Sequence, residues 1–344
     1  MTAPAPTIAT IARDPAWLAH RYHPGQDAVH FLPVPRDLHR ASTFITDDHL
    51  PRDLVPVPLR RTDAIAAAPA PAPIHFVFHA AYCCSTLVAR AFDRPGWAMG
   101  LKEPVILNDL VGWRRRGEPG PDMAQVLDDT LRLLARPFAP GEATIVKPST
   151  VVNALAPAML TLRPDARAIL LYAPLRTYLG SIAKKGIDGR LWVRTLLLGL
   201  LDDRLVDLGF TPRDHLGQTD LQVAAVGWLV QQQLYRQLVA RFGTARIRTL
   251  DSATLLANPH EAMRAMAALF DLPHDPATID AVVAGPAFKR HSKSDIAFDA
   301  ADRAAEHRDA AMIHRDEIEK VAVWAEAVAQ AAGLPLSDPA PLIA

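Results

Sequence analysis

Short apolar runs alternate with segments of helical periodicity from residue 74 onward. The runs include "IHFVFH" (74–79), "ATIVK" (143–147) and "ARAILLY" (166–172), and each precedes a segment where apolar residues recur every three or four positions. Runs that are apolar throughout predict strands buried on both faces, and helical connections between them predict parallel pairing. The predicted fold class is therefore α/β, a three-layer parallel sheet flanked by helices, with extra helices.

The segments on either side of this region have a different composition. Residues 1–73 carry short apolar pieces among prolines and end in the Pro/Ala spacer "AIAAAPAPAP". Such pieces predict irregular structure or edge strands wrapped on the main domain. We therefore expect an N-terminal extension at 1–73, one α/β domain at 74–335 and a C-terminal tail at 336–344.

The composition limits the classes of partner. Hydrophobic residues make up 50% of the 344 residues, which is enough for a substantial core. Lys plus Arg number 37, as do Asp plus Glu, and this balance argues against a general surface for polyanions. We expect no nucleic-acid partner, and any anion site must be local.

The cysteines and the apolar runs bear on compartment and metal content. The two cysteines are adjacent, and neighbouring cysteines rarely bridge each other or, without further ligands, hold zinc. We therefore expect no disulfide and no metal. The amino terminus lacks a signal-peptide pattern, and no run of about 20 apolar residues predicts a membrane span. These features favour a cytoplasmic protein, and nothing in the sequence indicates its oligomeric state.

The turn "HAAYCCST" at 79–86 joins the first apolar run to a predicted helix. Small residues let a backbone close on an anion, and a helix start presents unpaired N–H groups and a partial positive charge. The N–H groups of residues 82–86 and the hydroxyls of Ser85 and Thr86 would form the cradle. The other interpretation is structural, with Cys83 and Cys84 as small buried residues and Ser85 as an N-cap.

Four further residues are candidates for chemistry. Lys102 and Lys147 follow short apolar runs, so each is expected at a strand's carboxyl end as a cation, or else as an ion-paired or solvated lysine. Glu103 lies between Lys102 and a proline and is the candidate general base, a role that favours partial burial. His79 ends the first strand and is the alternative base, although a lone histidine is more often structural.

The segment "CCSTLVARAFDRPGWAMGLKEPVILNDL" (83–110) resembles the P-loop-fold sulfotransferases, especially the tyrosylprotein and glycan branches. That family binds the 5′ end of 3′-phosphoadenosine 5′-phosphosulfate (PAPS) with a loop of the type S-G-T-T-L. Residues Cys83 to Leu87 occupy these five positions. In the tyrosylprotein branch a glutamate on the next strand activates the acceptor hydroxyl, and Glu103 stands at that spacing.

Two later segments extend the resemblance over about residues 74–300. In "AILLYAPLRTYLGSI" (168–182), Ser181 fits the family's serine for the 3′-phosphate, and Arg176 fits a second arginine found there. The segment "FKRHSKS" (288–294) is similar to the basic loop that closes over the 3′-phosphate, through Lys289, Arg290 and Lys293.

The donor loop diverges from the family at three positions. Tyr82 stands where many members have Lys or Arg, Cys84 stands at the loop glycine, and Ala173 replaces the principal 3′-phosphate arginine. The resemblance implies a P-loop NTPase-like fold, PAPS as co-substrate without a metal, and a small-molecule, peptide or glycan hydroxyl as acceptor. The sequence does not identify the acceptor molecule.

Three other functions remain open. A nucleotide kinase or ATPase is disfavoured because the Gly-Lys pair of the phosphate loop is missing. A catalytically inactive nucleotide-binding relative is supported by Tyr82 and Ala173. A thiol enzyme would use Cys83 or Cys84 with His79.

Overall fold

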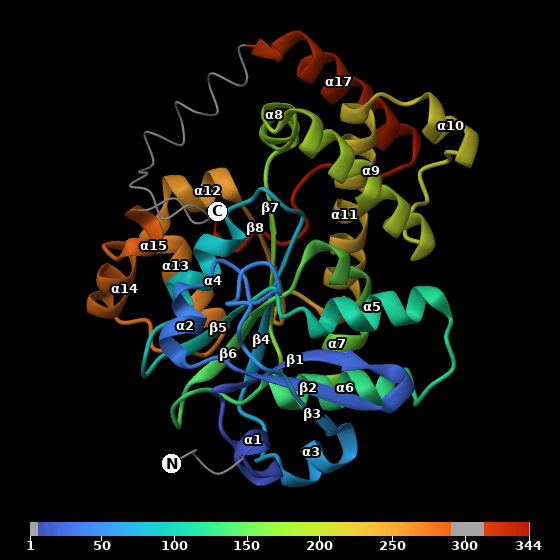
Figure 1. Cartoon of the computed structure of the whole chain (residues 1–344). Helices are drawn as coiled ribbons and strands as arrows, with labels where there is room; N and C mark the ends of the chain where they lie inside the picture. Colours follow the sequence, from blue (N-terminus) through green and yellow to red (C-terminus); the bar gives the residue numbers. More distant parts are fainter. Residues whose placement is uncertain (1–5, 290–312, 344) are drawn as a thin grey trace. The chain divides into compact units, whose positions relative to one another are not determined.

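The computed structural model describes residues 6–289 and 313–343 (Figure 1). The chain divides into two compact units. The first comprises Met1–Phe78, Thr86–Ala168 and Phe270–Pro273, and the second comprises His79–Ser85, Ile169–Leu269 and His274–Ala344. This division does not test the domain boundaries expected from the sequence, which remain predictions.

A five-stranded parallel sheet forms the centre of the fold, with the strand order β5-β6-β4-β7-β8. Every residue of three of its strands is buried, which is why their sequences are apolar runs without alternation. The α/β fold class predicted from the sequence is confirmed. The strands are β4 (Ile74–His79), β5 (Ala98–Lys102), β6 (Ala143–Lys147), β7 (Ala168–Tyr172) and β8 (Ile247–Asp251).

The strand order places a topological switch at β4. The chain goes from β4 out to β5, returns to β6 beside β4, and then reaches β7 on the other side of β4. In open α/β sheets, ligands bind beyond the carboxyl ends of the strands at such a switch point. The loop after β4, which the sequence singled out, leaves the sheet at this point.

The first unit also contains a small antiparallel sheet of order β1-β2-β3. Its strands are β1 (Trp17–His23), β2 (Ala28–Pro33) and β3 (Val57–Arg60). β2 is the middle strand of this sheet. The segment therefore forms a regular sheet with a central strand, whereas we expected only edge strands or irregular structure. Helix α5 packs against β1, as Figure 1 shows.

Helices of the first unit connect these strands. They are α1 (Ile8–Arg13), η1 (Pro24–Gln26), α2 (Arg36–Ala41), α3 (Arg61–Ala67), α4 (Ser85–Phe92, whose first residue belongs to the second unit), α5 (Ile106–Arg116), α6 (Met123–Leu134), η2 (Thr150–Leu155) and α7 (Ala156–Leu162).

The buried guanidinium of Arg136 joins the N-terminal segment to this unit. It donates to the carbonyls of Leu133, Ile11, Ala12 and Trp17 over 2.6–3.1 Å. Four acceptors satisfy a charge that burial would otherwise disfavour. Helix α1 and strand β1 are thereby fixed to the end of α6.

The second unit contains the longer helices. They are α8 (Leu175–Lys184), α9 (Gly186–Asp202), α10 (Pro212–Gly217), α11 (Asp220–Phe242), α12 (Ser252–Ala257), α13 (Pro259–Leu269), α14 (Pro276–Val283), α15 (Pro286–Lys289) and α17 (Arg315–Ala331). Helix α11 packs against α8, α9 and α17. Among the helices in the described ranges, none combines the length and hydropathy needed to cross a membrane.

The last described residues extend the sheet. Thr249 of β8 donates its N–H to the carbonyl of Ala340, and its own carbonyl accepts from the N–H of Leu342, both at 2.8 Å. Asp338 accepts hydrogen bonds from the hydroxyls of Tyr172 and Thr249. Residues 338–342 therefore run alongside the outer strand β8.

Candidate functional site

The loop between β4 and α4 has an unusual backbone. Ala81, Tyr82 and Cys84 have φ values of 66°, 50° and 64°, in the left-handed region that glycine normally occupies. Each such residue costs about 1–2 kcal/mol relative to right-handed geometry. Ser85 and Thr86 follow at the start of α4 and are 5% and 3% exposed.

His79 shapes this loop from inside. Its side chain is 4% exposed, and its Nδ1 accepts a hydrogen bond from the N–H of Ala81 at 3.1 Å. The N–H of Ala80 donates to the carbonyl of Leu171 on β7 at 3.0 Å. The first two amides of the loop are thus used to fold it, and the imidazole has the structural role of a loop cap.

The two cysteines differ in environment, and no disulfide joins them. Cys83 is fully buried, and its Sγ lies 3.4 Å from the carbonyl oxygen of Leu171. Cys84 is half-buried. A buried thiol that donates to a carbonyl is a small packing residue, so the environment of Cys83 does not favour a nucleophile.

Tyr82 belongs to an aromatic cluster in the second unit. Its ring centroid lies 5.4 Å from that of Trp192, edge to face, and 6.2 Å from that of Tyr178. The ammonium of Lys185 lies 5.9 Å from the Tyr82 ring centroid. Burial raises the pKa of Tyr82 to about 12, so its hydroxyl stays protonated at neutral pH. The Lys185 ammonium therefore lies over an aromatic ring of the loop after β4.

Glu103 and Lys147 form an ion pair in the first unit. Lys147 ends β6 with a side chain that is 1% exposed, and its ammonium bonds the Glu103 carboxylate, which is 20% exposed. Glu103 has a left-handed φ of 58°, and its N–H donates to the carbonyl of Lys147 at 2.7 Å. The ring of Phe44 lies 4.9 Å from the ammonium. The sequence-based candidates for cation and base are brought together here.

Lys102, the last residue of β5, has hydrogen-bond partners other than this pair. It is fully buried, and its ammonium donates to the carbonyls of His39 and Arg40 at the end of α2, at 2.7 and 3.1 Å. Asp93 lies 4.0 Å away. Burial lowers the pKa of Lys102 to about 8. Its ammonium is thus engaged at the end of α2, and its predicted catalytic role stays a prediction.

Arg176 and Ser181 lie on α8 and are engaged within the second unit. Arg176 bonds both carboxylate oxygens of Glu319 at 2.7 and 2.8 Å and one oxygen of Glu326 at 2.8 Å, both on α17. The Ser181 hydroxyl donates to the carbonyl of Thr177 at 2.9 Å. The guanidinium expected for a phosphate is thus held by two carboxylates.

The basic cluster near residue 290 is only partly covered by the structure. Lys289 is an exposed residue at the end of α15. Arg290 and Lys293 lie outside the described residues, so their predicted role stays a prediction. In the described part of the chain, no group of three or more His, Cys, Asp or Glu side chains is arranged to hold a metal.

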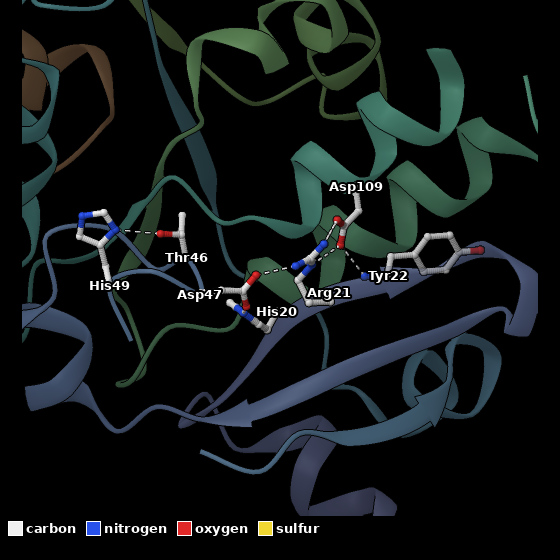
Figure 2. Close-up of polar contacts among 7 residues, drawn as sticks. All are labelled: His20, Arg21, Tyr22, Thr46, Asp47, His49 and Asp109. Atoms are coloured by element: carbon white, nitrogen blue, oxygen red, sulfur yellow. Dashed lines mark hydrogen bonds and ion pairs between the residues drawn. The ribbon is translucent and has the colours of Figure 1, made fainter. Parts of the chain in front are cut away.

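Sequence reasoning missed a polar network on β1, shown in Figure 2. Arg21 bonds both oxygens of Asp109 on α5 and an oxygen of Asp47, and the other Asp47 oxygen lies 2.6 Å from Nε2 of His20. Arg21 and Asp109 are 88 positions apart, so no local pattern links them. Beside this network lies a cavity of about 430 Å³, lined by Arg21, Tyr22, His23, Pro24, Gly25, Asn108, Asp109, Gly112, Arg116 and Glu118.

Comparison with known proteins yields two similar solved structures. The "Sulfotransferase Domain from the Curacin Biosynthetic Pathway" is 12% identical, and the match covers 78% of this chain and 100% of that one, with a TM-score of 0.41. Sulfotransferase STF9 from Mycobacterium avium is 16% identical over 74% of this chain and 78% of that one, with a TM-score of 0.42. No protein-family model and no curated protein matches the sequence. At these identities and TM-scores the two structures assign no activity to the chain.

Proposed function

We propose that this protein is a sulfotransferase that moves a sulfuryl group from PAPS to a hydroxyl acceptor. The observation that carries the proposal is the loop after β4, where Ala81, Tyr82 and Cys84 adopt left-handed geometry just before a helix begins. Successive N–H groups of a turn that includes left-handed residues can form a concave nest that binds an anion. Strained non-glycine backbone also concentrates at functional sites.

The loop supports a donor site in which the backbone does most of the binding. Ser85 and Thr86 add hydroxyl donors at the positive end of α4. Cys84 stands at the glycine position of the related loops, and its φ of 64° is the conformation for which glycine is used. Although Cys84 replaces glycine, its backbone keeps the left-handed conformation for which glycine is used.

The ion pair in the first unit supplies the two remaining chemical roles. In sulfuryl transfer the acceptor oxygen attacks sulfur, the bond from sulfur to the bridging oxygen of PAPS breaks, and 3′,5′-bisphosphoadenosine leaves. We assign Glu103 as the base that takes the hydroxyl proton and Lys147 as the cation that stabilises the departing oxygen. Their mutual hydrogen bond keeps the carboxylate oriented in the free protein.

A specific observation favours a second candidate, a nucleotide-binding relative without transfer activity. Arg176 is committed to Glu319 and Glu326, and the Ser181 hydroxyl to Thr177. A 3′-phosphate would have to displace two carboxylates from Arg176. This arrangement speaks against 3′-phosphate recognition by α8, so turnover must be measured as well as binding.

Thermal stabilisation tests the donor class. At 100 times its dissociation constant, 3′,5′-bisphosphoadenosine should add roughly 2.7 kcal/mol to the free energy of unfolding, whereas ATP and AMP should add less. Ser85→Ala should weaken this stabilisation. Ser252→Ala is the matched control, because Ser252 is also a buried serine at the start of a helix in the same unit and is 4% exposed. Stabilisation by ATP alone would contradict the donor assignment.

Turnover separates the two candidates. Release of 3′,5′-bisphosphoadenosine from PAPS with a panel of phenol, sugar and peptide hydroxyls should be detectable in the wild type. Glu103→Gln keeps an oxygen that accepts from Lys147 but has no basic carboxylate, so binding should persist while transfer falls by about 10²-fold or more. Binding without turnover in the wild type would instead support the inactive relative.

A further inference from the structure

The cavity beside β1 has a fixed wall of hydrogen-bond donors. The Nε–H group and one Nη2–H group of Arg21 donate to Asp109, and one Nη1–H group donates to Asp47. Three of its five N–H groups are therefore engaged. The other two have no partner among the described residues. Because carboxylates hold the guanidinium from two sides, the remaining donors point in fixed directions before any ligand arrives (Figure 2).

Asn108 contributes further donors to the same cavity. Its Oδ1 accepts from the hydroxyl of Ser149 at 2.7 Å, which fixes the amide so that Nδ2 is the end left over. Within the described residues Nδ2 has no partner. Neither ring nitrogen of His23, also on the wall, has a hydrogen-bond partner in that part of the chain. The wall therefore offers donors that a ligand can satisfy.

The carboxylates of the wall already accept hydrogen bonds, and the charges around the cavity do not favour an anion. Both oxygens of Asp109 accept from Arg21, and one also accepts the N–H of Tyr22 at 2.9 Å. Arg116 pairs with Glu118. Two guanidinium groups and two carboxylates line the cavity, and Asp47 adds a third carboxylate next to Arg21. An anion gains little here, whereas neutral oxygen acceptors match the open donors.

Gly112 keeps the cavity open. It lies inside helix α5, where glycine is the least favourable residue after proline. A Cβ built on it would approach only Nη1 at the far end of the flexible Arg116 side chain, at 3.1 Å. Close packing therefore does not require glycine at this position, and the missing side chain leaves the adjacent cavity open.

We propose that this cavity is a binding site for a neutral, oxygen-rich ligand of the polyhydroxyl class, such as a sugar. Its volume of about 430 Å³ lies within the range of small-molecule sites. All its lining residues belong to the first unit. The proposal does not depend on PAPS binding, and it stands even if the chain transfers no sulfuryl group.

Ligand-observed NMR on the full chain, without nucleotide, tests the ligand class. The probes are glucose, galactose, N-acetylglucosamine and maltose at millimolar concentration, with inorganic sulfate and glucose 6-phosphate as anionic counterparts. At least one neutral sugar should bind, and both anions should bind more weakly than it does. Failure of all four sugars, or tighter binding of an anion, would overturn the proposal.

Substitutions at Gly112 test the location. Gly112→Phe should weaken binding of the best sugar at least tenfold because it fills the cavity, whereas Gly112→Ala, which adds one methyl group, should retain it. Gly217→Phe is the matched control, since Gly217 is an exposed helical glycine in the other unit and a Cβ added to it would have no atom within 4 Å. Unchanged binding in a folded Gly112→Phe protein would place the sugar elsewhere.

Asn108→Asp tests the donor assignment with almost no change of shape. The variant keeps an oxygen for the Ser149 hydroxyl but loses both N–H donors, so sugar binding should weaken by about three- to tenfold. Thermal melting of each variant shows whether it is folded. Equal or tighter binding by Asn108→Asp would exclude the donor role and, with it, the class of ligand.

Discussion

Four non-glycine residues hold left-handed backbone in the two segments that carry the proposed chemistry. Ala81, Tyr82 and Cys84 do so after β4, and Glu103 does so after β5. Geometry of this kind persists only where surrounding bonds determine it, here the Ala81 bond to His79 and the Glu103 bond to the carbonyl of Lys147. At the scale of the residue, backbone conformation marks these segments more clearly than residue type.

Cys84→Gly should raise the free energy of unfolding or leave it unchanged. Relief of left-handed strain contributes about 1–2 kcal/mol, while the added freedom of the unfolded chain costs about 0.5–1 kcal/mol. Cys83→Gly is the matched comparison, because Cys83 lacks a positive φ and is fully buried. It should lose about 1–3 kcal/mol. Urea denaturation of the two variants measures both values.

The reverse order of stability in these variants would contradict the left-handed assignment. A loop in which Cys84 has ordinary backbone geometry would lose stability on substitution by glycine, as Cys83 is expected to do. The anion nest proposed for this loop would then lose its main support.

Helix α17 is held to α8 by a fork of ion pairs. Arg176 contacts Glu319 and Glu326, one above the other on α17, and Arg190 of α9 contacts Glu317, which precedes them on the same helix. The carboxylates, Glu319 first, raise the pKa of Arg176 above its ordinary value. Exposed pairs of this kind contribute little individually, but a guanidinium shared by two carboxylates fixes the position of a helix.

Arg176→Gln should loosen α17 without unfolding the protein. Hydrogen exchange in Arg315–Ala331 should become roughly two- to fivefold faster, since exposed ion pairs contribute weakly. If Arg176 serves only this fork, the affinity for 3′,5′-bisphosphoadenosine should not change. Arg190→Gln is the control for loss of a single pair on the same helix. A large loss of nucleotide affinity in Arg176→Gln alone would show that this arginine exchanges its carboxylates for a phosphate.

The stability of the whole molecule depends on ionisable groups sealed in its interior. Lys102 is fully buried with His39 and Asp93, which are 2% and 3% exposed. Burial lowers the pKa of Lys102 from 10.5 to about 8. Between these two values the unfolded chain retains a proton that the folded chain has lost, so the free energy of unfolding rises with pH through this window.

Lys102→Met should remove this contribution. Relative to the variant, the wild type should gain up to about 3 kcal/mol between pH 8 and pH 10.5, with no such gain below pH 7. Chemical denaturation of both proteins across this range measures the difference, and titration of the tyrosines cancels because both contain them. Parallel stability curves would mean that Lys102 keeps its charge inside the protein.

The fold was predictable to the extent that it depends on local patterns. The buried strands at 74–79, 143–147 and 168–172 read directly as apolar runs, because both faces of a parallel strand are covered. Strand β1 was missed, since "WLAHRYH" mixes apolar and basic residues and pairs within a small sheet. Its partners lie across a turn and a bulge that no periodicity reveals.

The candidate site was predictable at strand ends and not beyond them. The pairing of Lys147 with Glu103 follows from adjacent parallel strands that end together. The ion-pair partners of Arg176 could not be predicted from the sequence, because the two carboxylates lie about 150 positions away on α17. The Arg21 network was missed for the same reason. Long-range electrostatic partners are a property of the packed chain rather than of any segment.

The strip formed by residues 338–342 alongside β8 has a consequence for handling the protein. An uncovered outer strand is a template on which a second molecule can assemble, and here Ala340 and Leu342 take the bonds that Thr249 would otherwise offer. Affinity tags joined to this end, or truncations that remove residues 338–342, would expose the edge of β8. Exposure of this edge would promote the formation of fibres or dimers. Tags therefore belong at the opposite end of the polypeptide.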